Sequence, residues 1–470
     1  MSTDETVMRE YWLAPQTEGP LYSTVVLPGS KSQTSRAFVI GSIAQKPLEV
    51  TGALASRDTY LAACAMEQFG ARFTFDDEGT TLTIHPPETL RGGGTINCGL
   101  AGTVMRFGSA LAAFTDGQTT LVGDEAASHR PLKPLMDSLK SLGAKVEYGG
   151  RKGYLPVTIT GVEAPSRRKA ARKARKHSLG SPVRVDTSSS SQYLSALLLA
   201  SPLIPESIVL RAEGRLPSWP YVAMSIDMLA DQDVNVRRVS SWSWRTDPVR
   251  PAGNPIDIEP DLSNAGPFLA AALLAGGSVT IKDWPVRTDQ VGKYWLELLP
   301  QFGASVALSG NGLTVTAPQG LTWEGLELDL GPCGELAPTV AALCLFATTP
   351  STLIGISHLR GHETDRLEAL VTEIKRLGGS AQETYDGLHI IPAPLHGAAL
   401  ESYEDHRMAT FGAIVGLRVP GCGVADIGTT AKTLPDFPQR WAAMLTGQPS
   451  PPPLTLQQAF EDPSLVTATA

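Results

Sequence analysis

Residues 263–281 have the sequence SNAGPFLAAALLAGGSVTI. The stretch from Pro267 to Ala275 is apolar on most sides of a helix, which indicates a helix buried in a core. A short glycine turn follows, and the β-branched residues after it predict a strand. This order predicts a unit in which a buried helix leads into a strand.

The same order of polar start, Ala/Leu-rich helix, turn and strand occurs six times in the 470 residues. Repetition of this kind indicates an architecture built from copies of one supersecondary unit. Six units of about 70 residues each predict two α/β domains of three units. The units begin near Ser32, Ala101, Ser190, Ser263, Gly334 and Asp405.

A second helix in several units ends in a glycine, which fits the left-handed residue just past a helix end. The third unit has Asp231-Gln232-Asp233 at this place instead. Because the first helices are apolar nearly all round, we expect helices at the centre of each domain and sheets outside. The glycines are Gly70, Gly143, Gly303 and Gly378.

Composition and short motifs exclude several protein classes. No run of about 18 apolar residues predicts a membrane helix, and the N-terminus lacks the apolar core of a secretory signal, so a cytoplasmic protein is expected. The five cysteines form no CxxC pair and predict neither disulfides nor a zinc site. Neither GxGxxG after the first strand nor GxxxxGK[ST] occurs, which disfavours Rossmann and P-loop nucleotide binding.

The charge distribution is uneven. The net charge of -8 argues against a nucleic-acid-binding protein. Seven Lys and Arg residues nevertheless fall within 167–177, and we interpret 163–182 as a basic, solvated surface loop. The alternative is a patch for polyanion docking or self-association. The Pro-rich segment 447–470 is predicted to be a disordered tail.

Charged and polar residues gather at the predicted helix starts, where free N–H groups and the helix dipole favour anions. Capping alone explains Ser, Thr and Asp at single positions. Cations near a helix start are disfavoured unless an anion binds there. The residues concerned are Lys31, Ser32, Arg36, Gly102, Ser190, Ser191, Gln192, Glu335 and Arg407.

Further charges lie between the units, at Arg130, Glu363, Arg366 and Lys432. Glu363 and Arg366 are three residues apart and would share a helix face, as a surface salt bridge or as part of a site. Many cations with a few carboxylates suit phosphorylated and carboxylated small molecules in a cleft, with the carboxylates transferring protons.

Seven motifs occur in order between residues 22 and 440: LPGSKSxTxRA, GxAGTxMR, SSSSQ, SxPY, HETDR, DHRMA and TAKTxPD. This series resembles the EPSP synthase family of enolpyruvyl transferases. The resemblance implies a two-domain inside-out α/β barrel with the active site between the domains. It also implies a discontinuous domain from 1–29 plus 259–446, and a second domain from 30–258.

The implied reaction joins phosphoenolpyruvate to shikimate 3-phosphate and releases phosphate, with no metal or organic cofactor. A monomer that is inhibited by glyphosate is expected, with no nucleic-acid or membrane partner. The resemblance assigns catalysis to Glu335, Glu363 and Lys31, and we expect a raised pKa for Glu363 when the cleft closes.

By the same resemblance, two sets of residues hold the substrates. Shikimate 3-phosphate would contact Lys31, Ser32, Arg36, Ser190, Ser191, Gln192, Ser218, Tyr221, Glu335, His358 and His362. Phosphoenolpyruvate would contact Lys31, Gly102, Arg130, Gln192, Arg366, Arg407 and Lys432.

Four positions depart from the family pattern. Leu100 stands where Asn is common, and Glu335 replaces an Asp. His358 and His362 replace an Asn and a Lys, so one cation is lost unless His362 is protonated.

Two alternatives remain open. The sister transferase that acts on UDP-N-acetylglucosamine carries a loop Cys, which residues 101–135 lack. The other is a non-catalytic anion-binding protein, which the basic run would suit.

Overall fold

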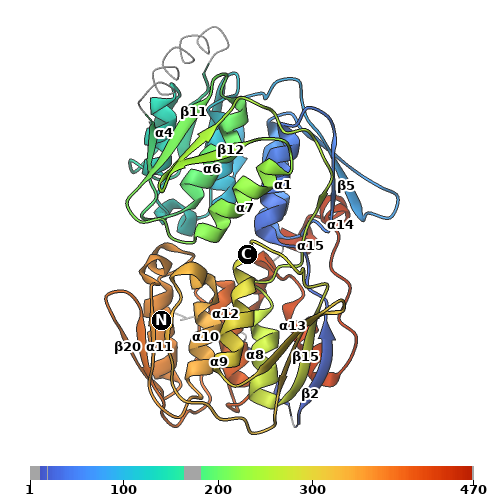
Figure 1. Cartoon of the computed structure of the whole chain (residues 1–470), viewed down its shortest axis with the longest axis vertical. Helices are drawn as coiled ribbons and strands as arrows, with labels where there is room; N and C mark the ends of the chain where they lie inside the picture. Colours follow the sequence, from blue (N-terminus) through green and yellow to red (C-terminus); the bar gives the residue numbers. More distant parts are fainter. Residues whose placement is uncertain (1–10, 18, 163–181, 468–470) are drawn as a thin grey trace, which may run out of the picture.

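The computed structural model describes residues 11–17, 19–162 and 182–467, and in it the chain forms two units stacked along the long axis (Figure 1). Each unit has its own hydrophobic core. The upper core draws on residues 37–258 and 456–466, and the lower core on residues 21–27 and 262–444. The expected mixed α/β class is confirmed. The basic run at 167–177 lies outside the described residues.

Helices occupy the middle of each unit. In the lower unit, α8 is buried from Gly266 to Leu274, because its Ala and Leu residues offer apolar surface on every side. The three lower helices contact one another, as do those of the upper unit. The central helices are α1 (Lys31–Ser42), the π-helical turn η1 (Val104–Gly108) with α3 (Ser109–Ala112), α6 (Gln192–Ala200), α8 (Gly266–Ala275), α10 (Ala337–Cys344) and α12 (His406–Gly416).

A second helix follows in each part of the chain, and a left-handed residue comes just after it. The four predicted glycines have positive φ, and in the third unit Asp233 takes this conformation at φ 63°. Gly447 does the same at φ 64° after α13. These helices are α2 (Arg57–Gln68), α4 (Lys133–Ser141), α7 (Trp219–Ala230), α9 (Trp295–Gln301), α11 (Arg366–Arg376) and α13 (Phe437–Thr446).

Five four-stranded sheets share one connectivity: the first two strands are parallel, and an antiparallel hairpin completes the sheet. The upper sheets are β14 (Ile256–Asp257), β3 (Leu48–Thr51), β5 (Thr81–His85) and β4 (Arg72–Phe75); β6 (Thr95–Asn97), β7 (Gln118–Val122), β9 (Val157–Thr160) and β8 (Lys145–Tyr148); and β10 (Val183–Asp186), β11 (Ile208–Glu213), β13 (Ser243–Thr246) and β12 (Val236–Ser240).

The lower sheets follow the same order, except for a three-stranded one. They are β2 (Leu21–Val25), β15 (Gly277–Lys282), β17 (Gly312–Ala317) and β16 (Ser305–Ser309); β18 (Glu327–Asp329), β19 (Ser351–Ile354), β21 (Leu388–Ile391) and β20 (Ser380–Glu383); and β1 (Tyr11–Leu13), β23 (Gly423–Ala425) and β22 (Ala399–Leu400). Buried and partly buried residues alternate along strands such as β5, so each sheet turns one face to the core.

The chain crosses from the lower to the upper unit after β2 and back again after β14, and these two crossings lie side by side. The Ser30 N–H donates to the Glu259 carbonyl at 2.8 Å, which ties the two crossings together. Gly29 is required there, because a Cβ atom would lie 1.9 Å from the Gly52 carbonyl oxygen. The site residues that follow each crossing are therefore held close together.

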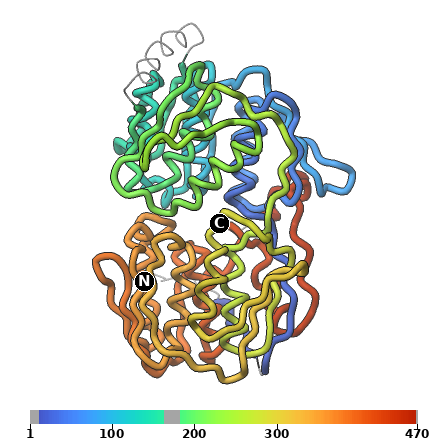
Figure 2. The backbone as a smooth tube through the Cα atoms, viewed as in Figure 1, coloured from blue at the N-terminus to red at the C-terminus, as the bar shows by residue number. Residues whose placement is uncertain are grey.

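The prediction of a disordered tail is wrong for the described residues up to 467. The chain returns to the upper unit and forms α14 (Leu456–Glu461) and α15 (Ser464–Thr467) (Figure 2). The Phe460 ring lies 5.6 Å from Tyr60 and 5.5 Å from Phe75, centroid to centroid. The Pro-rich segment connects the lower unit to the upper one, and Leu456, Ala459 and Val466 beyond it are part of the upper core. Within the described ranges, no helix is long and apolar enough to span a membrane.

Candidate active site

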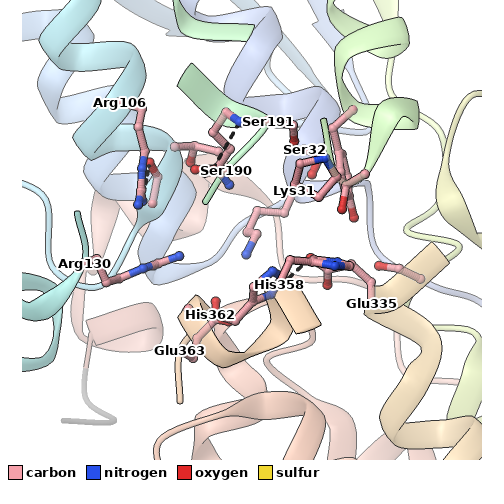
Figure 3. A pocket seen from close by; sticks show the side chains of 18 of the residues that line it. Lys31, Ser32, Arg106, Arg130, Ser190, Ser191, Glu335, His358, His362 and Glu363 are labelled. Atoms are coloured by element: carbon pink, nitrogen blue, oxygen red, sulfur yellow. Dashed lines mark hydrogen bonds and ion pairs between the residues drawn. The ribbon is translucent and has the colours of Figure 1, made fainter. Parts of the chain in front are cut away.

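A cavity lies between the two units, at the N-termini of the central helices (Figure 3). Lys31 opens α1, Gln192 opens α6, and Arg407 lies in the first turn of α12, as the sequence predicted. Every predicted site residue lines this cavity except Arg366 and Lys432, which lie behind it and contact the carboxylates that do.

The upper wall on the serine side is held by Arg36. Its guanidinium is buried and donates to Ser225 Oγ and to the carbonyls of Ser32 and Tyr221, each at 2.8 Å. Burial lowers its pKa to about 10, so it stays charged at neutral pH. Arg36 thus joins α1 to the start of α7, where Ser218 faces the cavity with φ 54°.

Two arginines meet beside Gly102. Arg106 Nη1 donates to the Gly102 carbonyl at 3.3 Å, and Arg130 Nη1 donates to the Leu100 carbonyl at 3.0 Å. Burial and then the charge of Arg130 lower the pKa of Arg106 to about 10. Two close cations that share no hydrogen-bonded carboxylate are costly unless an anion binds between them.

Arg366 organises the lower wall, and it is fully buried. It donates to Asp405 from Nε at 2.7 Å and from Nη2 at 3.1 Å, and to Glu363 Oε2 at 3.0 Å. The Glu363–Arg366 pair is therefore a buried contact at the start of α11, and its alternative interpretation as a surface salt bridge is wrong. The bidentate pair with Asp405 fixes the guanidinium plane.

The other two lower cations approach the two glutamates. Lys432 Nζ donates to Glu363 Oε1 at 2.7 Å. Arg407 Nε lies 3.4 Å from Glu335 Oε2, and its two Nη atoms donate to Ser263. Each glutamate therefore lies next to two cations, one of them Arg366.

Neighbouring cations lower the pKa of both glutamates, and for Glu363 this differs from the expectation. Burial opposes ionisation of Glu335, but the charges of Arg407 and Arg366 outweigh it and lower the pKa to about 2. For Glu363 burial also opposes ionisation, and Lys432 and Arg366 hold the pKa well below its usual value. The raised pKa expected for Glu363 is therefore not found, because its cationic neighbours are paired to it.

The two histidines that replace family residues are neutral at pH 7. Burial, and then the charge of Arg366, lower the pKa of His362 to about 3. Burial also lowers the pKa of His358. Arg366 Nη1 lies 3.2 Å from His362 Nδ1, which must accept, so the ring proton is assigned to Nε2. His362 thus does not replace the lost cation.

Buried polar atoms without a hydrogen-bond partner are rare in folded proteins. Several of them belong to residues that line this cavity, and their concentration here points to a polar ligand. They are Arg106 Nε, Arg130 Nε, Gln192 Oε1, His358 Nε2, His406 Nδ1 and Arg407 Nε.

The sequence interpretation missed several lining residues. Asp58 lies 3.5 Å from Lys31 Nζ, and Asp261 accepts from the Lys31 N–H at 3.3 Å. Arg106 and His406 lie inside the GxAGTxMR and DHRMA motifs, which could have identified them. Asp58 and Asp261 lie outside all seven motifs, and only the fold brings them to Lys31.

Comparison with known proteins gives the same family as the motifs. The family model described as EPSP synthase (3-phosphoshikimate 1-carboxyvinyltransferase) matches residues 15–441. A 3-phosphoshikimate 1-carboxyvinyltransferase from Kocuria rhizophila is 48% identical over 446 residues, covering 93% of this chain and 97% of the relative. One from Bifidobacterium longum is 44% identical over 447 residues, covering 92% and 98%.

Solved structures agree on the fold. An EPSP synthase from Acinetobacter baumannii superposes with a TM-score of 0.72 at 22% identity, covering 92% of this chain and 97% of the other. The enolpyruvyl transferase NikO from Streptomyces tendae gives 0.68 at 16% identity, covering 91% and 96%. With the family match and the close relatives spanning nearly the whole chain, this protein belongs to the EPSP synthase family.

Proposed function

We propose that this chain transfers the enolpyruvyl group of phosphoenolpyruvate to the 5-hydroxyl of shikimate 3-phosphate and releases phosphate. This is enolpyruvyl transfer in the shikimate pathway. The observation that carries the proposal is the cavity between the units, where two glutamates lie among Lys31, Arg130, Arg366, Arg407 and Lys432. Neither substrate requires a metal or organic cofactor in this chemistry.

Phosphoenolpyruvate is assigned to the arginine side of the cavity. Its phosphate and carboxylate would meet Lys31, Gly102, Arg130 and Gln192 from above, and Arg366, Arg407 and Lys432 from below. Shikimate 3-phosphate is assigned to the serine side, with Ser190, Ser191, Ser218, Arg36 and Tyr221 above and His358 and His362 below. The partnerless buried atoms of Arg130 and Gln192 support this arrangement.

In the addition step, the 5-hydroxyl oxygen attacks C2 of phosphoenolpyruvate and gives its proton to Glu335. Glu363 gives a proton to C3, so the methylene becomes a methyl group and a ketal phosphate forms. In the elimination step, the Glu363 carboxylate takes a proton back from C3, the C2–C3 double bond forms again, the bond from C2 to the phosphate oxygen breaks, and phosphate leaves. Lys31 assists this departure as a nearby cation.

Glu363 needs a change in charge before it can act, whereas Glu335 is already an ionised carboxylate. Glu363 must be protonated to act as an acid, yet Lys432 and Arg366 keep its pKa low. Anionic substrates that pair with these cations would raise the pKa of Glu363 and make Glu335 a stronger base. Binding of both substrates would thus prepare the acid and the base together.

The architecture also belongs to this proposal. We assign residues 1–29 and 259–446 to one domain and 30–258 to the other, each an inside-out α/β barrel of three repeated units. The shared strand order of five sheets supports the repeats. We expect a monomer, because one chain supplies both walls of the cavity.

The direct test is phosphate release by the purified protein with phosphoenolpyruvate and either shikimate 3-phosphate or UDP-N-acetylglucosamine, with EDTA present. Release with shikimate 3-phosphate alone is expected. Release with the UDP-sugar alone would transfer the function to the sister enzyme. Release with neither acceptor would refute transferase activity and favour the anion-binding alternative.

A further inference from the structure

A second cavity continues outward from the serine side of the site to the surface. It shares Ser189, Ser218 and His358 with the candidate active site, and both units line it. Arg215 contributes to its upper wall and Asp386 to its lower wall. Arg215 is absent from the family motifs and from the site residues assigned above.

Arg215 reaches from the upper unit to the lower one. Its Nη1 donates to Ser357 Oγ at 3.3 Å and lies 3.6 Å from Asp386 Oδ1. The Arg215 backbone is fixed, since its carbonyl accepts from the buried Thr187 Oγ1 at 2.7 Å. Thr187 directly precedes the serine run 188–191, so Arg215 and the serine wall are parts of one rigid surface.

On the lower side, Asp386 holds the turn at residues 355–357. Asp386 Oδ2 accepts from the Gly355 N–H at 3.1 Å, and its carbonyl accepts from the Ile356 N–H at 2.9 Å. Asp386 Oδ1 is a buried atom, and it lies 3.6 Å from Arg215 Nη1 of the upper unit. The turn leads into η6 (Ser357–Gly361), which carries His358.

We propose that Arg215 is a positioning residue that latches the closed cleft, by docking on Ser357 and Asp386 and so holding the His358 turn against the serine wall. This inference rests on the proposed function, and it concerns how that site closes. A contact that joins the two units across the mouth of the cavity favours the closed arrangement of the units over an open one.

The latch acts on binding rather than on chemistry. For a ligand that binds only the closed state, the apparent Kd is the intrinsic Kd divided by the fraction of molecules that are closed. A smaller closed fraction therefore raises the apparent Kd. At saturating substrate all molecules are closed, and turnover is unaffected. Because both partners are partly exposed, with 67% and 32% of their side chains accessible, the effect is modest and screened by salt.

The test compares full-length wild type with Arg215→Ala, Arg215→Lys, Asp386→Asn and the double variant Arg215→Ala/Asp386→Asn. Arg184→Ala is the matched control, because Arg184 is an exposed arginine paired with Glu213 inside the upper unit. Steady-state kinetics give KM and kcat at low and high NaCl. Calorimetry of shikimate 3-phosphate binding gives a second measurement that does not depend on turnover.

Arg215→Ala should raise the KM for shikimate 3-phosphate about two- to five-fold and leave kcat within about a factor of two. The ratio of the variant's KM to the wild-type KM should approach one at high salt, because salt screens the ion pair. Arg215→Lys should have a KM between those of wild type and Arg215→Ala. The double variant should have the same KM as Arg215→Ala, since both changes remove one contact.

Three results would overturn the latch: Arg215→Ala behaves like Arg184→Ala, kcat falls while KM is unchanged, or the effects of Arg215→Ala and Asp386→Asn add independently. If the wild type itself releases no phosphate, the proposed function fails and the latch fails with it. If the wild type turns over normally but the variants do not show the expected changes in KM, only the latch is refuted.

Discussion

Glu335 and Glu363 have different neighbours although both contact Arg366. Glu363 accepts from Lys432 at 2.7 Å and from Arg366 at 3.0 Å, whereas Glu335 has only ion pairs of 3.4 Å or more. Glu335 is thus the less constrained carboxylate, which suits a base that must reach a hydroxyl. Glu363 is held in place, which suits an acid that must face one carbon.

We predict that Glu335→Ala and Glu363→Ala each lower kcat by about 10²–10⁴-fold, the usual contribution of a general acid or base. The KM of either substrate should change far less. Glu368→Ala, an exposed carboxylate in the first turn of α11, is the control and should leave kcat unchanged. Wild-type kcat in either site variant would remove that residue from the mechanism.

Gly102 allows a second prediction. A Cβ atom there would lie 2.7 Å from Arg106 Nη1 and 3.1 Å from both Arg130 Nη2 and Gln192 Oε1. Gly102→Ala must therefore displace the groups assigned to phosphoenolpyruvate, at a cost of about 1–3 kcal/mol. We expect glyphosate to inhibit wild type, and Gly102→Ala to raise both its inhibition constant and the KM for phosphoenolpyruvate at least several-fold. An unchanged inhibition constant would contradict the assignment.

At the scale of elements, local chemistry made most helices predictable. The buried helices follow from their Ala and Leu content, and the residues after the outer helices follow from the need for positive φ. That need holds even where glycine is missing, since Asp233 takes the conformation at φ 63°. The tail was not predictable, because its order depends on Tyr60, Phe73 and Phe75, which are distant in sequence.

The tail gives a stability prediction. Phe460 packs on three aromatic rings but is only partly buried, so Phe460→Ala should lower the free energy of unfolding by about 2–4 kcal/mol, somewhat less than a fully buried Phe. Leu465→Ala, at a side chain that is 50% exposed, should change it by less than about 0.5 kcal/mol. Urea denaturation measures both, and equal values would show that the tail does not contribute to the upper core.

Over the whole molecule, the site forms where the two units meet, and this explains how much of it the sequence could predict. The motifs located most of the residues that line the cavity, because their order matches a known family. They did not reveal that Arg366 lies behind the cavity, nor that Asp58 and Asp261 approach Lys31, since those contacts depend on how the units meet. The pKa directions of the glutamates likewise depend on neighbours from several elements.

Three histidines that line the cavity make the folded chain sensitive to acid. Burial lowers the pKa of His358, His362 and His406 in the folded chain. Below pH 6.5 the unfolded chain binds protons that the folded chain rejects, so stability falls as the pH falls. For His362, with a folded pKa of about 3, the loss between pH 7 and 5 is about 1–2 kcal/mol.

Urea denaturation at pH 7 and pH 5 tests this effect. Stability should drop at pH 5, and His362→Asn should lose about 1–2 kcal/mol less than wild type over the same interval. A drop of equal size in both proteins would mean that His362 is already charged in the folded state.

Enolpyruvyl transfer by addition and elimination leaves an isotope signature that proton NMR detects in the product formed in D2O. With phosphoenolpyruvate and shikimate 3-phosphate, we expect an enolpyruvyl ether that appears at the same rate as phosphate. Its vinyl protons should be partly replaced by deuterium, because C3 passes through a methyl group. Phosphate without the ether, or an ether whose vinyl protons are all retained, would contradict the account.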